Sequence, residues 1–136
     1  MTLTFDHIGV FVRDLATGRE HLQRLLPIAH TSAVVDDPLL KVSVQFLHDS
    51  AGTCYELVAP FGEGNPVDAV LADGRNILNH VAYKARDFEA SVAHYRASGC
   101  MPLGPARPAL AFRNARVIFF LTPLRMIVEL IEDGNA

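Results

Sequence analysis

The sequence predicts an α+β fold made of two pseudo-symmetric β-α-β-β-β modules. The first observation behind this is an internal repeat: FDHIGVFVRDL at 5–15 returns as LNHVAYKARDF at 78–88, at an offset of 73 residues. The second is that each half contains a strand-like segment, a helix-like segment and three more strand-like segments in the same order. We expect residues 1–136 to form a single domain of eight strands, with modules at about 5–63 and 78–136 and a linker at 64–77.

The repeat holds in one ungapped register. His7 matches His80, and the Arg-Asp pair at 13–14 matches the pair at 86–87. CYELVA at 54–59 matches IVELIE at 127–132, which sets Glu56 on Glu129, and KVSVQFL at 41–47 matches NARVIFF at 114–120. Unrelated segments would rarely keep all of these residues aligned, so we interpret the halves as a duplication.

In the first module, TFDHIGVFV is short and rich in Val, Ile and Phe, which favours a strand. Asp14 is the expected N-cap of a helix over 15–26 that ends at Pro27. Strands are expected at 31–36, 41–48 and 53–59, with HDSAGT at 48–53 as a hairpin turn. The apolar face of the helix is expected to consist of Leu15, Leu22, Leu25 and Leu26.

The second module repeats this order. Asp87 is the expected N-cap of a helix over 88–98, whose apolar face carries Phe88, Val92 and Tyr95 and which ends at Gly99. Further predictions are strands at 101–104, 114–121 and 126–132, a TPLR turn at 122–125 and a proline-broken loop at 105–112. In the linker, Asn65 and Pro66 suit the start of a short helix.

Composition and charge exclude several classes of protein. Half of the residues are hydrophobic, 20% are charged and the formal net charge is -3, without a densely basic stretch. This argues against nucleic acid or an anionic membrane as a partner. No run of 18 apolar residues and no basic-then-apolar leader is present, so we expect a cytoplasmic protein. Cys54 and Cys100 are too few and too far apart for a zinc knuckle or a disulfide framework, and we expect reduced, packed thiols.

Each half also carries one histidine and one glutamate inside an apolar strand. Taken singly, a histidine of this kind is usually a hydrogen-bonded core residue, and a strand glutamate usually faces solvent. A buried carboxylate must instead find a cation, a metal or water. If all four side chains point inward, they form a set of two nitrogen and two oxygen ligands that suits Zn, Ni, Co or Mn. The set would be His7, Glu56, His80 and Glu129.

The paired modules resemble the vicinal oxygen chelate superfamily of glyoxalases, bleomycin-resistance proteins and dioxygenases, and most closely its methylmalonyl-CoA epimerase-like branch. The resemblance rests on FDHIGVFVRDL, on the block from YELVAPFGEG to LNHVAYKARDF, and on MIVELIE near the end. It implies two β-α-β-β-β modules whose sheets curl around a metal cleft. It also implies that His7, Glu56, His80 and Glu129 are the metal ligands and that the protein is a homodimer.

The same resemblance implies a divalent-metal-dependent isomerase or epimerase. Its substrate would be a small carbonyl compound or acyl-thioester, and the reaction would pass through a metal-stabilised enolate. Glu56 and Glu129 could serve as catalytic bases. The sequence departs from the epimerases where they carry a catalytic glutamate before the third strand: here the segment reads VVDDPLLKV. Asp36 or Asp37 could replace that glutamate, or both could belong to a surface turn.

Three alternatives stay open beside this hypothesis. A glyoxalase I-type lyase would use the same ligand set. An extradiol-type dioxygenase would hold Fe(II) with His7, His80 and Glu129 alone, and Glu56 argues against it as a fourth ligand. A non-enzymatic ligand-binding or resistance protein would lack a complete ligand set and would line its cleft with aromatic side chains. The second matched histidine pair, His21 and His94, falls in the helices, and we expect neither residue to bind a metal.

Overall fold

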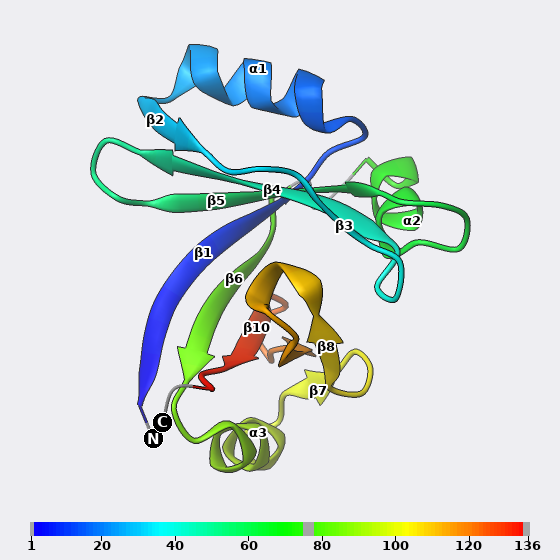
Figure 1. Ribbon diagram of the computed structural model, residues 1–136. Coiled ribbons are helices and arrows are strands. Elements are labelled where there is room, and N and C mark those ends of the chain that lie inside the picture. The colour runs from blue at the N-terminus through cyan, green and yellow to red at the C-terminus, as the bar shows by residue number, and fades with distance from the viewer. Residues whose placement is uncertain (1, 75–77, 135–136) are drawn as a thin grey trace. The chain divides into compact units, whose positions relative to one another are not determined.

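The computed structural model describes residues 2–74 and 78–134 and divides the chain into two compact units. The N-terminal unit comprises residues 7–79, and the C-terminal unit comprises residues 1–6 together with 80–136. The described residues contain ten strands, three α-helices and one 3-10 helix (Figure 1). The α+β class and the duplicated order of elements are therefore confirmed. Residues 75–77 of the predicted linker lie outside the described residues.

The N-terminal unit is a mixed sheet with one long helix. Its elements are the second half of β1 (Leu3–Phe11), α1 (Leu15–Leu25), β2 (Ile28–Thr31), β3 (Val35–Asp37), β4 (Val42–Asp49), β5 (Cys54–Pro60) and α2 (Pro66–Ala72). The strand order is β2-β4-β5-β1, and β3 also pairs with β4. β1 and β5 run parallel, whereas β4 and β5 form an antiparallel hairpin. β5 thus has a hydrogen-bonded neighbour on each side.

The C-terminal unit repeats this plan. Its elements are β6 (Leu78–Ala85) from His80 onward, α3 (Phe88–Ala97), β7 (Met101–Pro102), β8 (Arg107–Ala109), the 3-10 helix η1 (Leu110–Phe112), β9 (Ala115–Leu121) and β10 (Ile127–Glu132). The strand order is β6-β10-β9-β7, and β8 also pairs with β9. β10 is parallel to β6 and antiparallel to β9, so it matches β5 in the other unit.

The three helices begin where the sequence predicts. Asp14 accepts a hydrogen bond from the Thr17 N–H at 2.9 Å, and Asp87 accepts one from the Ala90 N–H at 3.2 Å. Asn65 caps α2, and Pro66 occupies its first turn. These side chains satisfy N–H groups that have no partner inside a helix.

The apolar faces of α1 and α3 differ in how well they match prediction. Phe88 is buried in a core cluster with Ala85, Ile118, Phe120, Val128 and Leu130, and Val92 and Tyr95 pack against that cluster. α1 has no fully buried residue, and Leu25 is 75% exposed. The prediction that Leu25 belongs to a buried apolar face of the helix is therefore wrong: Leu25 lies in the final turn, just before the chain leaves the helix at Leu26 in an extended conformation.

The expected strand at 31–36 is split into β2 and β3. Between them, the hydroxyl of Ser32 accepts a hydrogen bond from the Phe46 N–H, and the side chain of Gln45 donates to the Ser32 carbonyl, both at 2.9 Å. Side-chain hydrogen bonds thus replace part of the regular ladder. In the other unit, the expected loop at 105–112 contains β8 and η1. Pro108 fits β8 because that short strand pairs only with β9.

Candidate functional site

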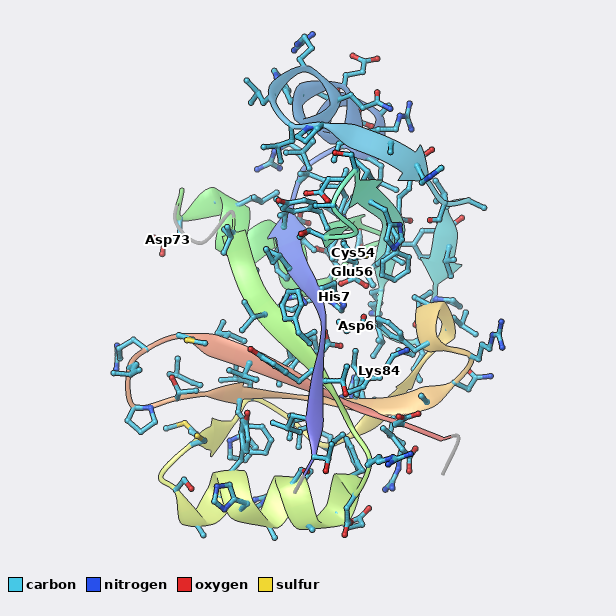
Figure 2. The ribbon with its side chains drawn as sticks, turned by 90° about the vertical axis from the view of Figure 1, so that its left-hand side faces the viewer. Asp6, His7, Cys54, Glu56, Asp73 and Lys84 are labelled. Carbon is cyan, nitrogen blue, oxygen red and sulfur yellow. The ribbon has the colours of Figure 1, made fainter. Side chains whose placement is uncertain are left out.

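In the N-terminal unit, the first predicted pair comes together. His7 lies on β1, Glu56 lies on the neighbouring strand β5, and Gly9 is the Cα partner of Glu56 in the parallel register. The Nε2 atom of His7 is 3.2 Å from Oε1 of Glu56, and both side chains are at least nine-tenths buried. Figure 2 labels both residues in this unit. A buried glutamate and a buried imidazole therefore face each other on one side of the sheet.

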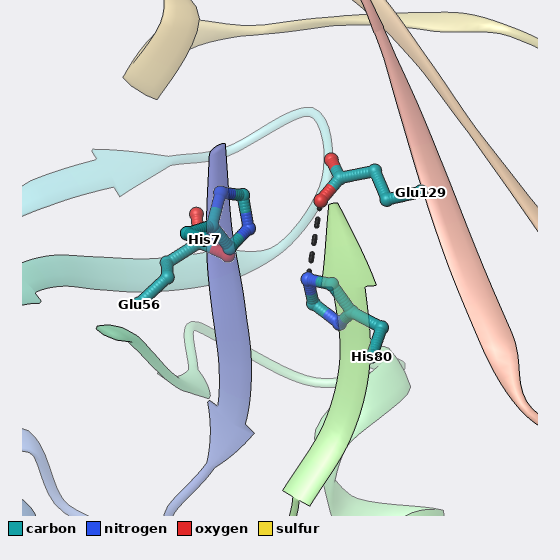
Figure 3. A group of neighbouring side chains, drawn as sticks. All are labelled: His7, Glu56, His80 and Glu129. Carbon is teal, nitrogen blue, oxygen red and sulfur yellow. Dashed lines mark ion pairs between the residues drawn. The ribbon is translucent and has the colours of Figure 1, made fainter. Parts of the chain in front are cut away.

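The C-terminal unit holds the second pair in the same arrangement. His80 lies on β6 and Glu129 on β10, where Ile127 is the Cα partner of His80. The Nε2 atom of His80 is 3.1 Å from Oε1 of Glu129, and both side chains are again almost fully buried. Figure 3 draws both pairs, and its dashed line marks this second contact. The duplication thus preserves a contact between two side chains as well as the order of the elements.

Each histidine also contacts a phenylalanine that sequence analysis did not select. Phe46 is opposite Glu56 on β4, and its ring meets the His7 ring at 6.0 Å between centroids in an edge-to-face geometry. Phe119 is opposite Glu129 on β9 and meets His80 in the same way at 5.1 Å. KVSVQFL aligns with NARVIFF, so Phe46 matches Phe119 across the repeat. This match is the feature of the sequence from which the two phenylalanines could have been predicted. Each phenylalanine ring thus packs against one imidazole in a favourable aromatic geometry.

The described side chains that could hold a metal ion are the buried His7, Glu56, His80 and Glu129. The geometry within each pair supports this. Two ligands that occupy neighbouring corners of an octahedron with bonds of about 2.1 Å are about 3.0 Å apart, whereas tetrahedral neighbours are about 3.4 Å apart. The contacts of 3.2 and 3.1 Å lie between these values, and both exceed the 2.7–2.9 Å that is typical of a charge-assisted hydrogen bond. Neutral imidazole nitrogen and carboxylate oxygen are also the ligand atoms that divalent first-row metals accept.

The two aspartates considered as replacements for the epimerase glutamate have structural roles. Asp37 is buried, and its Oδ1 accepts hydrogen bonds from the Leu39 and Leu40 N–H groups, which orders the turn before β4. Asp36 accepts a hydrogen bond from the Ser43 hydroxyl. Residues that pair directly across strands share a face, and Ser43 alternates with the residues on the Glu56 face, so Asp36 lies on the opposite face of the sheet. Both aspartates thus lie in strand β3, with Asp36 exposed and Asp37 buried, so the interpretation as a surface turn is wrong.

The histidines of the two long helices and the two cysteines are not part of this group of side chains. His21 and His94 are exposed on α1 and α3, and the Nδ1 atom of His21 is 2.9 Å from Nη2 of Arg24. Neither Cys54, which is buried, nor Cys100, which is half-buried, forms a disulfide. Among the described residues, no helix is both long and apolar enough to span a membrane.

Comparison with known proteins identifies the family. Residues 6–132 match the model of the Glyoxalase/Bleomycin resistance protein/Dioxygenase superfamily, so the chain belongs to that superfamily. A search of curated proteins returned no significant match.

Solved structures agree with this assignment. A hypothetical protein from Bacillus halodurans C-125 is similar with a TM-score of 0.81 and 20% identity, over 100% of this chain and 98% of that one. Methylmalonyl-CoA epimerase from Mycobacterium tuberculosis is similar with a TM-score of 0.75 and 23% identity, over 94% and 86%. A Streptomyces coelicolor methylmalonyl-CoA epimerase in complex with 2-nitronate-propionyl-CoA gives 0.70 and 25% identity, over 98% and 99%.

Proposed function

We propose that the two His–Glu pairs together hold one divalent ion and that the protein is a metal-dependent isomerase or epimerase. Its substrate would be a small carbonyl compound or acyl-thioester. The observation that carries this proposal is the duplicated, buried His–Glu contact in a member of the superfamily. In this proposal, residues 1–136 act as a single domain to which both modules contribute ligands.

The reason for assigning both pairs to one ion is coordination number. One pair offers one nitrogen and one oxygen, and sites for divalent transition metals in proteins usually have three or four protein ligands. The course of the chain supports the same conclusion. β1 is continuous through Asp6 and His7, and β6 is continuous through Asn79 and His80, yet the boundaries of the two units fall between these neighbours. Each histidine is thus covalently bonded to a residue of the other unit.

The ligand set suits enolisation. When bound, Zn, Ni, Co or Mn would supply Lewis acidity to a carbonyl oxygen of the substrate, and four protein ligands would leave two positions of an octahedral ion for that substrate. Glu56 and Glu129 would orient the substrate and carry a proton at a carboxylate oxygen. The half-buried rings of Phe46 and Phe119 beside the histidines would limit the access of water. The epimerases among the similar structures make a thioester the first substrate class to examine.

The ligand geometry also separates this proposal from a dioxygenase. That chemistry would need three protein ligands and a free side for oxygen, so Glu56 would have to stand apart from the site. Glu56 is instead held against His7 at 3.2 Å. The cytoplasmic location and the homodimeric state stay predictions.

The proposal is tested by exchange of substrate hydrogen with solvent. Protein purified without a histidine tag is loaded with Co²⁺ or Mn²⁺ and incubated in D₂O with methylmalonyl-CoA and other 2-substituted acyl thioesters. We expect deuterium at C2 by mass spectrometry, and we expect EDTA to abolish its incorporation.

Two variants on β10 provide the matched comparison. Glu129→Gln should lower metal occupancy or abolish exchange. Glu132→Gln, three residues further along the same strand, should keep both, because Glu132 pairs with Arg116. Metal-loaded wild-type protein that exchanges no thioester hydrogen would contradict the proposal.

A further inference from the structure

A row of three reactive side chains crosses the sheet of the N-terminal unit next to Glu56. His30 on β2 is the Cα partner of His48 on β4, and His48 is the Cα partner of Cys54 on β5. Residues directly opposite each other on neighbouring strands point to the same face of a sheet. Cys54 precedes Glu56 by two residues, so this histidine row lies on the Glu56 face. Figure 2 labels Cys54, Glu56 and His7 close together in this unit.

Phe46 confirms which face this is. Phe46 is two residues before His48 on β4, is opposite Glu56, and contacts the His7 ring edge-to-face. His48 therefore projects from the same side of β4 toward which His7 and Glu56 point. The His48 side chain is half-buried, and no group among the described residues hydrogen-bonds its ring.

The equivalent row in the C-terminal unit is apolar. There, Met101 on β7 is opposite Leu121 on β9, and Leu121 is opposite Ile127 on β10. Leu121 and Ile127 follow His48 and Cys54 by the repeat offset of 73 residues. The duplication thus preserves the metal-ligand pairs but places ionisable side chains beside only one of them. If His48 only supported the fold, as Leu121 does at the equivalent position, an ionisable side chain would not be needed there.

Distance along the sheet distinguishes His48 from Asp37. Asp37 shares the Glu56 face, but it pairs with Val42, which pairs with Pro60, four residues beyond Glu56. Asp37 therefore lies about 13 Å from Glu56 along the strand direction. Its Oδ1 accepts hydrogen bonds from two backbone N–H groups. His48 is the diagonal neighbour of Glu56 on the adjacent strand. Such neighbours are about 7–8 Å apart, within reach of an aromatic side chain and of a substrate held between them.

We propose that His48 is a catalytic acid–base residue of this enzyme, which takes the role that the missing glutamate leaves open. The inference rests on the proposed function. A ring nitrogen of His48 takes the proton from the carbon beside the substrate carbonyl. The C–H electron pair becomes the carbon–carbon double bond of the enolate, and the carbonyl π pair moves to oxygen. Return of a proton to that carbon reverses both shifts, and a glutamate carries the second proton that epimerisation requires.

The test compares His48→Asn and His48→Ala with His94→Ala, which removes an exposed histidine from α3. The probe is the acyl thioester that the wild-type protein exchanges fastest in D₂O. We expect both His48 variants to lose exchange by roughly 10²- to 10⁴-fold in kcat, with unchanged metal content and with thermal unfolding close to that of the wild type. Added imidazole should restore exchange to His48→Ala and should not accelerate the wild type. His94→Ala should behave as the wild type.

The outcomes separate this inference from the proposed function. Exchange within about threefold of the wild type in both His48 variants would overturn the role of His48 and leave the proposed function standing. Loss of exchange together with loss of metal, or without rescue by imidazole, would assign His48 a structural role and also overturn it. Absence of exchange in the metal-loaded wild type would remove the proposed function and this inference with it.

Discussion

At the scale of single residues, the two His–Glu pairs explain why polar side chains lie inside apolar strands. Each carboxylate is almost fully buried and each has an imidazole nitrogen within 3.2 Å. Burial of either group alone would cost several kcal/mol. Pairing the two groups, and packing a phenylalanine ring against each imidazole, reduces this cost and fixes the orientation of the imidazole. The second shared feature, a ring at Phe46 and Phe119, supports the view that the pairs have the same role.

A further residue-scale feature is the ion-pair cluster that connects β9, β10 and α3. Nη2 of Arg116 donates to Oε2 of Glu132 at 2.8 Å and to Oε1 of Glu89 at 2.7 Å, and its guanidinium lies over the Phe88 ring. The hydrogen bond from Arg116 lowers the pKa of Glu132 below its ordinary value of 4.5. A carboxylate with a depressed pKa in the folded state stabilises the fold above its unfolded pKa, and this contribution is lost as pH falls through the folded pKa.

This gives a prediction for pH dependence. Glu132→Gln should be less stable than the wild type near pH 7, and the difference in unfolding free energy should shrink as pH falls from about 6 to about 3. Urea denaturation followed by circular dichroism across that range measures the difference. Glu20→Gln, an exposed change on α1 away from this cluster, serves as the control variant. A difference that is constant with pH would mean that Arg116 does not influence the titration of Glu132.

At the scale of elements, α1 and α3 pack against the segments that precede them with different combinations of residue size. Gly18 on α1 faces Val12, and a Cβ at Gly18 would lie 2.9 Å from Cγ1 of Val12. At the positions 73 residues later, the second module has Ser91 and Ala85, both fully buried. In the first module, the helix residue Gly18 is smaller than Val12 on the segment before the helix. In the second module, the helix residue Ser91 is larger than Ala85.

This arrangement predicts coupling between the two positions. Gly18→Ala should destabilise the protein by about 1 kcal/mol, because the steric conflict with Val12 outweighs the gain in helix propensity. Adding Val12→Ala should recover part of the loss, so that the double variant is more stable than the sum of the single effects by at least about 0.5 kcal/mol. A double-mutant cycle on unfolding free energies measures this, and strict additivity would contradict the packing account.

Much of the element plan could be predicted from sequence because it depends on local signals. The caps at Asp14, Asp87 and Asn65 act within three residues, and the repeat offset carried the first strand, the long helix and the last two strands from one module to the other. The break between β2 and β3 could not be predicted, because it depends on hydrogen bonds between Ser32 and residues of β4 more than ten positions away. Pairing across strands also decided which face Asp36 and His48 occupy.

At the scale of the whole molecule, duplication is the basis of the proposed function. The repeat alone could identify His7, Glu56, His80 and Glu129 as candidates. It could not establish that each histidine contacts its glutamate, because the spacing of residues along one strand does not determine which strand pairs with it. The structure supplies that contact once in each unit. The family model independently places the chain in the superfamily, and the metal-assisted enolisation proposed above depends on these contacts.

The central claim is that one ion is shared by side chains from both modules, and metal stoichiometry tests it most directly. Equilibrium dialysis against Co²⁺, followed by elemental analysis, should find one ion per chain in the wild type. His7→Ala and His80→Ala, each in a different module, should separately abolish tight binding while thermal unfolding shows that both variants remain folded. Two ions per chain, or full retention of the ion in either variant, would contradict a shared site.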